Sequence, residues 1–318
     1  MKFNTDRLIF VFLILLAGCG GGESESRVES GNREGVFHFG NHAEPQGLDP
    51  HIVTGIPEHH ILTALFEGLV LKNPYTLDIE PGVAKAWDIS DDGLTYTFQL
   101  RDNASWSNGD LITAEDFRWS WQRALSPILG SEYSYMYYPI ENAEAYNTGR
   151  MADFSQVGVS VLDDHTLQVK LHSPTPYFLQ LLDHYSMFPV HRATLESFGA
   201  DSDRLTAWAQ EGNTVTNGAF VLTEWQINSH VRVEKNRSYW DAEEVDLNAI
   251  VFYPTENLVT EERMFRDGQL HRTAEIPLDK IITYQQEQPE VTRIAPWIGS
   301  YFYMFNTNRA PMDDVRVR

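Results

Sequence analysis

The sequence predicts a mixed α/β or α+β fold, because strands and helices are expected in an irregular order along the chain. Two observations support this fold class. Alternating apolar runs flank short turns rich in Asp, Asn and Gly, as in hairpins. Apolar residues at helical spacing follow helix-start signals elsewhere. With 318 residues, 42% of them hydrophobic and 12% aromatic, the chain can fill the core of one large domain or about two ordinary ones.

The start of the chain has the pattern of a secretory signal. A basic segment precedes an apolar run from Leu8 to Ala17. At 1.5 Å per residue this run is too short to span a hydrocarbon core about 30 Å thick, which favours a signal peptide over a membrane helix. Leu16–Cys19 resembles the bacterial lipobox, and Cys19 is the only cysteine. We therefore expect a signal peptide over residues 1–18 and a lipid on Cys19; the alternative is an ordinary signal peptide with an incidental cysteine.

Residues 19–34 are expected to form a flexible tether. The stretch from 20 to 35, GGGESESRVESGNREG, contains almost no apolar residue. Such a segment cannot offset its ordering entropy by burial. An exported globular body would then begin near residue 35.

The first half of the body alternates between strands and helices. A strand is predicted over Val36–Gly40, and a helix through apolar positions 61 to 69. Two strand-like runs join at Asp91–Gly93, a hairpin turn. Thr113 and the acidic residues after it resemble a helix N-cap and first turn, and that helix should stop before Pro127. A second hairpin is predicted around residues 163–165.

The second half continues in the same mixed manner. Helices are predicted near residues 192–198, 259–267 and 278–286. Strands are predicted near 219–225, 231–235, 249–253, 291–294 and 301–305.

Charge and cysteine content exclude several classes of function. There are 45 Asp and Glu residues against 24 Lys and Arg, giving a net charge of −21 and a pI near 4.8. A broad nucleic-acid surface needs clustered basic residues, so this composition argues against one. A single cysteine permits no internal disulfide and no four-cysteine zinc site.

No catalytic constellation is evident in the sequence. G-x-S-x-G, the Walker loop, H-E-x-x-H and G-x-G-x-x-G are all absent. Neighbouring residues on a helix point about 100° apart, so His59 and His60 would not chelate one metal without further ligands. We therefore expect that the protein is not an enzyme and that it binds no cofactor and no metal. The tyrosine cluster over residues 133–138 would suit either a core or the wall of a ligand cleft.

A series of short strings, in order from Asn41 to Arg318, resembles one family. The strings are AEPQGLDPH, LFEGLV, PGVAKAW, GLTYTFQLR, ASWSNGD, TAEDFRWSWQRAL, PTPYF, TNGAF, KNRSYW, YFYMFN and APMDDVRVR. They resemble extracytoplasmic solute-binding proteins of peptide ABC importers, above all the oligopeptide-binding and murein-peptide-binding members. One departure is visible: Gly268–Leu270 is followed by His271 and Arg272, where members usually have an acidic residue.

The resemblance implies a type II periplasmic-binding-protein fold, the Venus flytrap, in which two lobes close over a ligand. Lobe I would comprise residues 35–66 and 191–298, and an extra α+β domain would be inserted over residues 67–190. Lobe II would begin at residues 299–318 and be mostly missing, so the chain is expected to be an N-terminal fragment.

The resemblance also implies how a ligand would be bound. Peptides of varied sequence can be held by their backbone, added as a strand to the protein. Thr54, Gly55 and Ile56 would supply backbone partners from lobe I, and Tyr133 would reach the cleft from the extra domain. Further cleft positions are Glu275, Trp297, Ser300 and Phe302.

The expected function is therefore a substrate-binding lipoprotein that captures oligopeptides and delivers them to the permease of an ABC importer. It would act as a monomer in the periplasm or at the cell surface, anchored by lipid to a bacterial membrane. Two alternatives stay open: a binding protein of this family for another solute, such as nickel or haem, and a peptide sensor without import.

Overall fold

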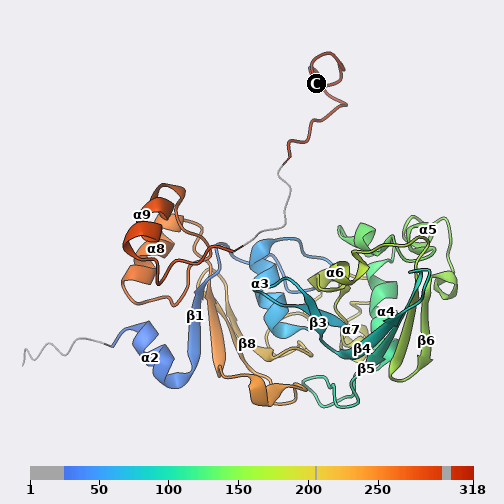
Figure 1. The fold of residues 1–318 in the computed structure, drawn as a ribbon, viewed down its shortest axis with the longest axis horizontal. Helices are drawn as coiled ribbons and strands as arrows, with labels where there is room; N and C mark the ends of the chain where they lie inside the picture. The colour runs from blue at the N-terminus through green and yellow to red at the C-terminus, as the bar shows by residue number, and fades with distance from the viewer. Residues whose placement is uncertain (1–24, 205, 296–301) are drawn as a thin grey trace, which may run out of the picture. The chain divides into compact units, whose positions relative to one another are not determined.

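The computed structural model describes residues 25–204, 206–295 and 302–318. The chain divides into two compact units, one ending at Pro277 and the other comprising Leu278–Arg318. The first unit contains three β-sheets and most of the helices (Figure 1).

The sheet that contains the first strand of the chain has the strand order β1-β10-β9-β8. Its strands are β1 Val36–Gly40, β8 Phe220–Gln226, β9 His230–Lys235 and β10 Ala249–Tyr253. β1 is parallel to β10, with Val36 opposite Ala249, and the other two pairings are antiparallel. The predicted strands near 36–40, 219–225, 231–235 and 249–253 are thus confirmed as one sheet.

The other large sheet is antiparallel, in the order β4-β5-β7-β6. Its strands are β4 Ala84–Ile89, β5 Thr95–Leu100, β6 Val159–Asp163 and β7 Thr166–Lys170. Both predicted hairpins are present here, and Gly93 has a φ of +68° in the first turn. A small sheet that was not predicted pairs β2 Val70–Lys72 with β3 Ile79–Pro81.

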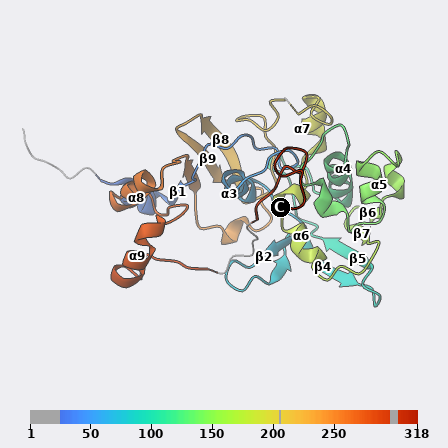
Figure 2. The ribbon, with the colours of Figure 1, turned by 90° about the horizontal axis from the view of Figure 1, so that it is seen from above.

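The longer helices occupy defined places between and on these sheets. α3 Ile56–Leu65 contacts β8 and lies between the two four-stranded sheets in both views (Figures 1 and 2). α4 Ala114–Ala124 packs on β6 and β7. As predicted, α4 begins at the N-cap Thr113, where a capping box with Asp116 is present.

The remaining helices are short. The α-helices are α5 Ala143–Asn147, α6 Phe178–Leu182, α7 Arg192–Ser197, α8 Leu258–Arg266 and, in the second unit, α9 Ile281–Glu287. The 3-10 helices are η2 Ser134–Tyr137, η3 Phe154–Gln156, η4 Tyr185–Met187, η5 Ala242–Glu244 and η6 Leu278–Lys280.

One continuous core joins the two large sheets. It includes Phe66 and Leu65 at the end of α3, Phe98 in β5, Trp121 in α4 and Val233 in β9, all almost fully buried. Burying aromatic side chains of this size contributes a large part of the stability of such a core. The core therefore fixes α3 and α4 relative to each other.

The expected tether is wrong for residues 27–34, which form the helix α2 Arg27–Glu34. Ser26 and Glu29 make a capping box, and Gly35 ends the helix with a φ of +67°. The helix lies against β1 because Gly31 has no side chain: a Cβ there would lie 2.5 Å from the carbonyl oxygen of Val36. Residues 19–24 lie outside the described part of the chain.

Two predicted strands are also absent from the described residues. Val291–Ile294 contains no strand, and residues 302–305 run outside any sheet. A strand exists only where a neighbour completes its hydrogen bonds, and neither segment has such a neighbour among the residues described.

Candidate functional site

The segment Thr54–Ile56 leads into α3 with a backbone that only glycine suits. Gly55 has a φ of +151°, and a Cβ there would lie 2.2 Å from the carboxylate Oε2 of Glu58. Among the described residues, neither the N–H nor the C=O of Thr54 has a hydrogen-bond partner. This segment therefore offers unpaired backbone groups beside a sharply defined turn.

Tyr185 of η4 holds this segment in place. Its hydroxyl donates to the carbonyl oxygen of Val53 at 3.2 Å and accepts from the N–H of Gly55 at 3.3 Å. Burial raises the pKa of Tyr185, so the hydroxyl keeps its proton at neutral pH. One side chain thus fixes the backbone on both sides of Thr54.

Tyr133 lies in an aromatic cluster around Tyr185. The ring centroids of Tyr133 and Tyr185 are 5.9 Å apart, nearly perpendicular, and Tyr133 is 4.7 Å from His184. His59 of α3 lies 5.7 Å from Tyr185. We call His59, Tyr133, His184 and Tyr185 the Tyr185 cluster. It places the predicted residue Tyr133 against the side chain that fixes Gly55.

The two histidines of the cluster differ in their hydrogen bonds. Nδ1 of His184 accepts from the N–H of Ser186 at 3.2 Å, which leaves the proton of the neutral ring on Nε2. Burial, with the charges of His59 and Lys72, lowers the pKa of His184 to about 4. Burial and the charge of Lys72, partly offset by Asp183, also lower the pKa of His59. Both rings are therefore neutral at pH 7.

The LDPH string builds a buried network beneath this loop. Arg123 of α4 binds Asp49 through Nη2–Oδ2 at 2.6 Å and Nη1–Oδ1 at 3.0 Å. The indole of Trp208 donates to the same carboxylate at 3.1 Å. Although burial opposes it, the charge and hydrogen bonds of Arg123 hold the pKa of Asp49 below its usual value.

His51 completes the network as a neutral ring. Its Nε2 donates to the carbonyl oxygen of Phe188 at 3.0 Å, and its Nδ1 accepts from Arg123 at 3.0 Å. Burial and the nearby guanidinium lower the pKa of His51 to about 4. The loop that carries Thr54 is thereby tied to α4 and to the segment before α7.

Three further strings meet at Glu67. Tyr239 donates to one carboxylate oxygen of Glu67, and Trp240 donates to the other at 2.8 Å. Asn217 accepts from the backbone N–H of Glu67 at 3.1 Å and donates to its carbonyl at 2.9 Å. These hydrogen bonds therefore join the LFEGLV string at the end of α3 to the TNGAF string before β8 and the KNRSYW string after β9.

Glu275, in contrast, has no contact with the Tyr185 cluster among the described residues. It is exposed, and the segment before it is held by its neighbour Ala274, whose N–H donates to Glu261 at 3.2 Å. Phe302 is 69% exposed and belongs to the second unit. Trp297, Ser300 and Cys19 lie outside the described residues.

The unusual His271 has a packing role. Its Nδ1 accepts from the backbone N–H of His38 at 3.0 Å, and its ring stacks on that of His38 at 5.6 Å. Arg272, which follows it, accepts from the N–H of Gly40 through its carbonyl at 2.9 Å. His271 and Arg272, which stand where family members usually have an acidic residue, therefore bind the edge of the sheet at β1.

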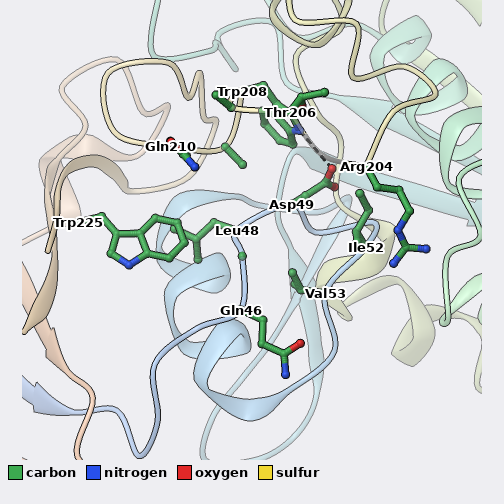
Figure 3. Close-up of a pocket in the computed structure, with 13 residues that line it drawn as sticks. Gln46, Leu48, Asp49, Ile52, Val53, Arg204, Thr206, Trp208, Gln210 and Trp225 are labelled. Atoms are coloured by element: carbon green, nitrogen blue, oxygen red, sulfur yellow. Dashed lines mark hydrogen bonds between the residues drawn. The ribbon is translucent and has the colours of Figure 1, made fainter. Parts of the chain in front are cut away.

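A cavity of about 420 Å³ lies beside the LDPH loop and was not predicted from the sequence (Figure 3). Leu48, Ile52, Trp208 and Trp225 form much of its wall, and the Trp208 indole points at Asp49. A second cavity of similar volume shares Trp225. Trp208 and Trp225 come from segments far along the chain from residue 48, so no local pattern could have shown the cavity.

Among the residues described, no group of His, Cys, Asp or Glu side chains could hold a metal ion. Over the same residues, no helix has the length and apolarity needed to cross a membrane.

Comparison with known proteins gives consistent matches. The family model of bacterial extracellular solute-binding proteins, family 5 (middle), matches residues 78–318. The periplasmic oligopeptide-binding protein OppA of Salmonella typhimurium is 38% identical over 285 residues, covering 87% of this chain and 50% of the relative. The periplasmic murein peptide-binding protein MppA of Escherichia coli is 36% identical, covering 86% of this chain and 50% of the relative.

Solved structures agree with the sequence matches. The murein tripeptide binding protein MppA of E. coli has a TM-score of 0.82 at 34% identity, over 89% of this chain and 54% of that one. Haemophilus influenzae OppA, solved with RPPGFSPFR, has a TM-score of 0.80 at 31% identity, with the same coverage. The chain spans about half the length of these relatives.

The predicted mixed α/β fold is thus confirmed, and the matched family is one of solute-binding proteins rather than enzymes. The chain belongs to the family 5 bacterial extracellular solute-binding proteins.

Proposed function

We propose that this protein captures oligopeptides outside the cytoplasmic membrane and delivers them to the permease of an ABC importer. The observation that carries the proposal is the unpaired backbone of Thr54 beside the fixed turn at Gly55. An extended peptide can pair with such groups whatever its side chains are. The names of the relatives support the same ligand class, since OppA is named for oligopeptides and MppA for murein peptides.

The proposal includes a division of the chain into lobes. Residues 35–66 and 191–298 form lobe I, residues 67–190 form an inserted domain, and lobe II begins at residue 299. The Tyr185 cluster fits this division, because His59 belongs to lobe I whereas Tyr133, His184 and Tyr185 belong to the inserted domain. Closing of the two lobes over a peptide would signal the loaded state to the permease.

Isothermal titration of the mature protein with a pool of tripeptides to pentapeptides tests the proposal. We expect saturable binding, weakened by Gly55→Val, which blocks the turn. Absence of binding to every peptide, in protein with native circular dichroism, would refute it. Mass spectrometry of protein purified without added ligand then distinguishes a peptide from nickel or haem. A transport assay in cells lacking the permease distinguishes import from sensing.

The membrane anchor is a separate part of the proposal. Cys19 is the only cysteine and follows Leu16–Gly18 in a lipobox-like order. We expect the mature protein to begin at Cys19 and to carry a diacylglycerol thioether. Intact-mass measurement of membrane-extracted protein, with Cys19→Ser as the control, checks this. A mature mass without lipid would show that the signal is an ordinary one.

A further inference from the structure

A single hydroxyl binds residues 53–55 along one edge. Tyr185 donates to the carbonyl oxygen of Val53 at 3.2 Å and accepts from the N–H of Gly55 at 3.3 Å. In an extended chain, the carbonyl of one residue and the N–H two residues later face the same edge, where a neighbouring strand would bind both. The Tyr185 hydroxyl therefore takes the place of a neighbouring strand.

The planar peptide bond then fixes the direction of the Thr54 backbone groups. The bonds on both sides of Thr54 are trans, and across a trans peptide bond the C=O and the N–H point in opposite directions. The carbonyl of Val53 points at Tyr185, so the N–H of Thr54 points away from it. The N–H of Gly55 points at Tyr185, so the carbonyl of Thr54 also points away. Both groups of Thr54 thus face the edge opposite the hydroxyl.

The remaining backbone groups of residues 53–55 are already paired. The N–H of Val53 donates to the carbonyl oxygen of Asp49 at 3.2 Å, and the carbonyl oxygen of Gly55 accepts from the N–H of His59 at 3.1 Å. Only the N–H and C=O of Thr54 have no partner among the described residues. Because Thr54 is only half-buried, a ligand can reach them.

Tyr185 itself has little freedom to move. It is 1% exposed, and the centroid of its ring lies 4.3 Å from that of His184 and 5.9 Å from that of Tyr133. The packed rings therefore keep the hydroxyl at one point beside the segment. Groups that are held in their binding direction before a ligand arrives lose less entropy on binding.

We propose that Tyr185 is a positioning residue for peptide binding, which acts by aiming both backbone groups of Thr54 at the peptide. The inference rests on the proposed function, because it concerns the same site. Thr54 donates its N–H to a peptide carbonyl and accepts a peptide N–H at its own carbonyl. The peptide must therefore keep its N–H at the paired position, which neither proline nor an N-methylated residue can fill.

A scan with N-methylated peptides tests the inference. Pentaalanine and four analogues, each N-methylated at one of positions 2 to 5, are titrated calorimetrically into the mature protein and into Tyr185→Phe. In the wild type, methylation of at least one position should lower the affinity by at least about tenfold, because a polar group is left unpaired. In Tyr185→Phe, pentaalanine should bind about tenfold more weakly. At one of the sensitive positions, methylation should now lower the affinity less than about threefold.

Tyr137→Phe is the matched control. The Tyr137 hydroxyl is also buried and donates to a backbone carbonyl, that of Ser186, but it forms no hydrogen bond to residues 53–55. This variant also loses a buried hydrogen bond, and its response to the five peptides should match that of the wild type. If both variants change the response to N-methylation alike, the effect is a general loosening of the fold, and the positioning role is refuted.

Hydrogen exchange of the wild type gives a second readout that needs no variant. At single-residue resolution, the amide of Gly55 should be protected in the empty protein. The amide of Thr54 should exchange at least about tenfold more slowly once pentaalanine is bound. An unprotected Gly55 amide, or a Thr54 amide that the peptide does not slow, would overturn the inference even if Tyr185→Phe fails to fold.

The results separate this inference from the proposed function. If Tyr185→Phe responds to N-methylation as the wild type does, the positioning role is refuted while peptide binding stands. If pentaalanine does not bind the wild type, the inference fails, and titration with the peptide pool decides whether the proposed function fails with it.

Discussion

Arg123 and Asp49 form a buried two-point ion pair, with Nη2–Oδ2 at 2.6 Å and Nη1–Oδ1 at 3.0 Å. The side chains are only 1% and 10% exposed. This pair connects α4, which packs on the β4–β7 sheet, to the loop that carries Thr54. Its position makes the geometry of the candidate site depend on a single guanidinium.

Removal of this guanidinium should strongly destabilise the protein. In Arg123→Leu the carboxylate of Asp49 stays buried without a counter-charge, so we expect the free energy of unfolding to fall by about 3–5 kcal/mol. Urea unfolding measures the change. The control is Arg150→Leu, because Arg150 and Glu144 form an exposed pair, and here the loss should stay below about 1 kcal/mol. Equal losses in the two variants would contradict the role assigned to the buried pair.

The turn at Gly55 should not tolerate a side chain. Gly55→Ala combines a left-handed backbone with a contact of 2.2 Å to Glu58, so we expect a loss of about 2–4 kcal/mol in unfolding free energy and weaker peptide binding. Gly149→Ala is the matched control, since Gly149 also has a positive φ of +72° but has no atom near its Cβ position. It should cost about 1 kcal/mol and leave peptide affinity unchanged. Urea unfolding and calorimetric titration give the two readouts.

Glu67 should make stability depend on pH. Burial raises its pKa to about 7, although hydrogen bonds from Tyr239 and Trp240 oppose the shift. The folded state therefore holds a proton that the unfolded state releases near pH 4.5, so the contribution of this group is lost as the pH rises from 4.5 through 7.

Glu67→Gln has no proton to lose at this position. Its unfolding free energy relative to the wild type should therefore increase by at most about 1.4 kcal/mol per pH unit between pH 4.5 and 7, and level off above pH 7. Urea unfolding at five pH values measures the difference. Glu132→Gln, at an exposed position, should show no such trend. A constant difference across the range would show that Glu67 does not titrate there.

The segment Phe302–Phe305 should promote self-association of this chain. Its four apolar side chains are between 50% and 87% exposed. Exposed aromatic runs of this kind are prone to pair between molecules. We expect concentration-dependent light scattering, reduced in Met304→Lys. The control is Leu278→Lys, which alters a single exposed apolar residue of the same unit; a similar reduction there would argue against a specific role of the segment.

Patterns of residues close in sequence predicted most of the helices and strands. The wrong predictions lie where contacts between residues far apart in sequence determine the structure. Thr113 with Asp116 and the turn at Asp91–Gly93 specify their structures through neighbours in sequence, so these predictions are confirmed. The sequence of α2 contains the capping residues Ser26 and Glu29 but no apolar face, so a helix was not predicted there. The helix packs closely on β1 because Gly31 has no side chain.

The candidate site was predictable only in part. Thr54–Ile56 and Tyr133 follow from the family resemblance, and the structure brings them together through Tyr185. Tyr185 itself was not anticipated, since its role depends on a contact with Gly55 across 130 residues of sequence.

The parallel pairing of β1 with β10 sets an order for folding. Val36 lies opposite Ala249, so the N-terminal strand has no neighbour in its sheet until more than two hundred further residues have emerged. The β4-β5-β7-β6 sheet closes over shorter separations and can form first. Until β10 has been made, β1 thus stays an open strand, and an unpaired strand of this kind is the sort of segment that a holding chaperone protects from aggregation.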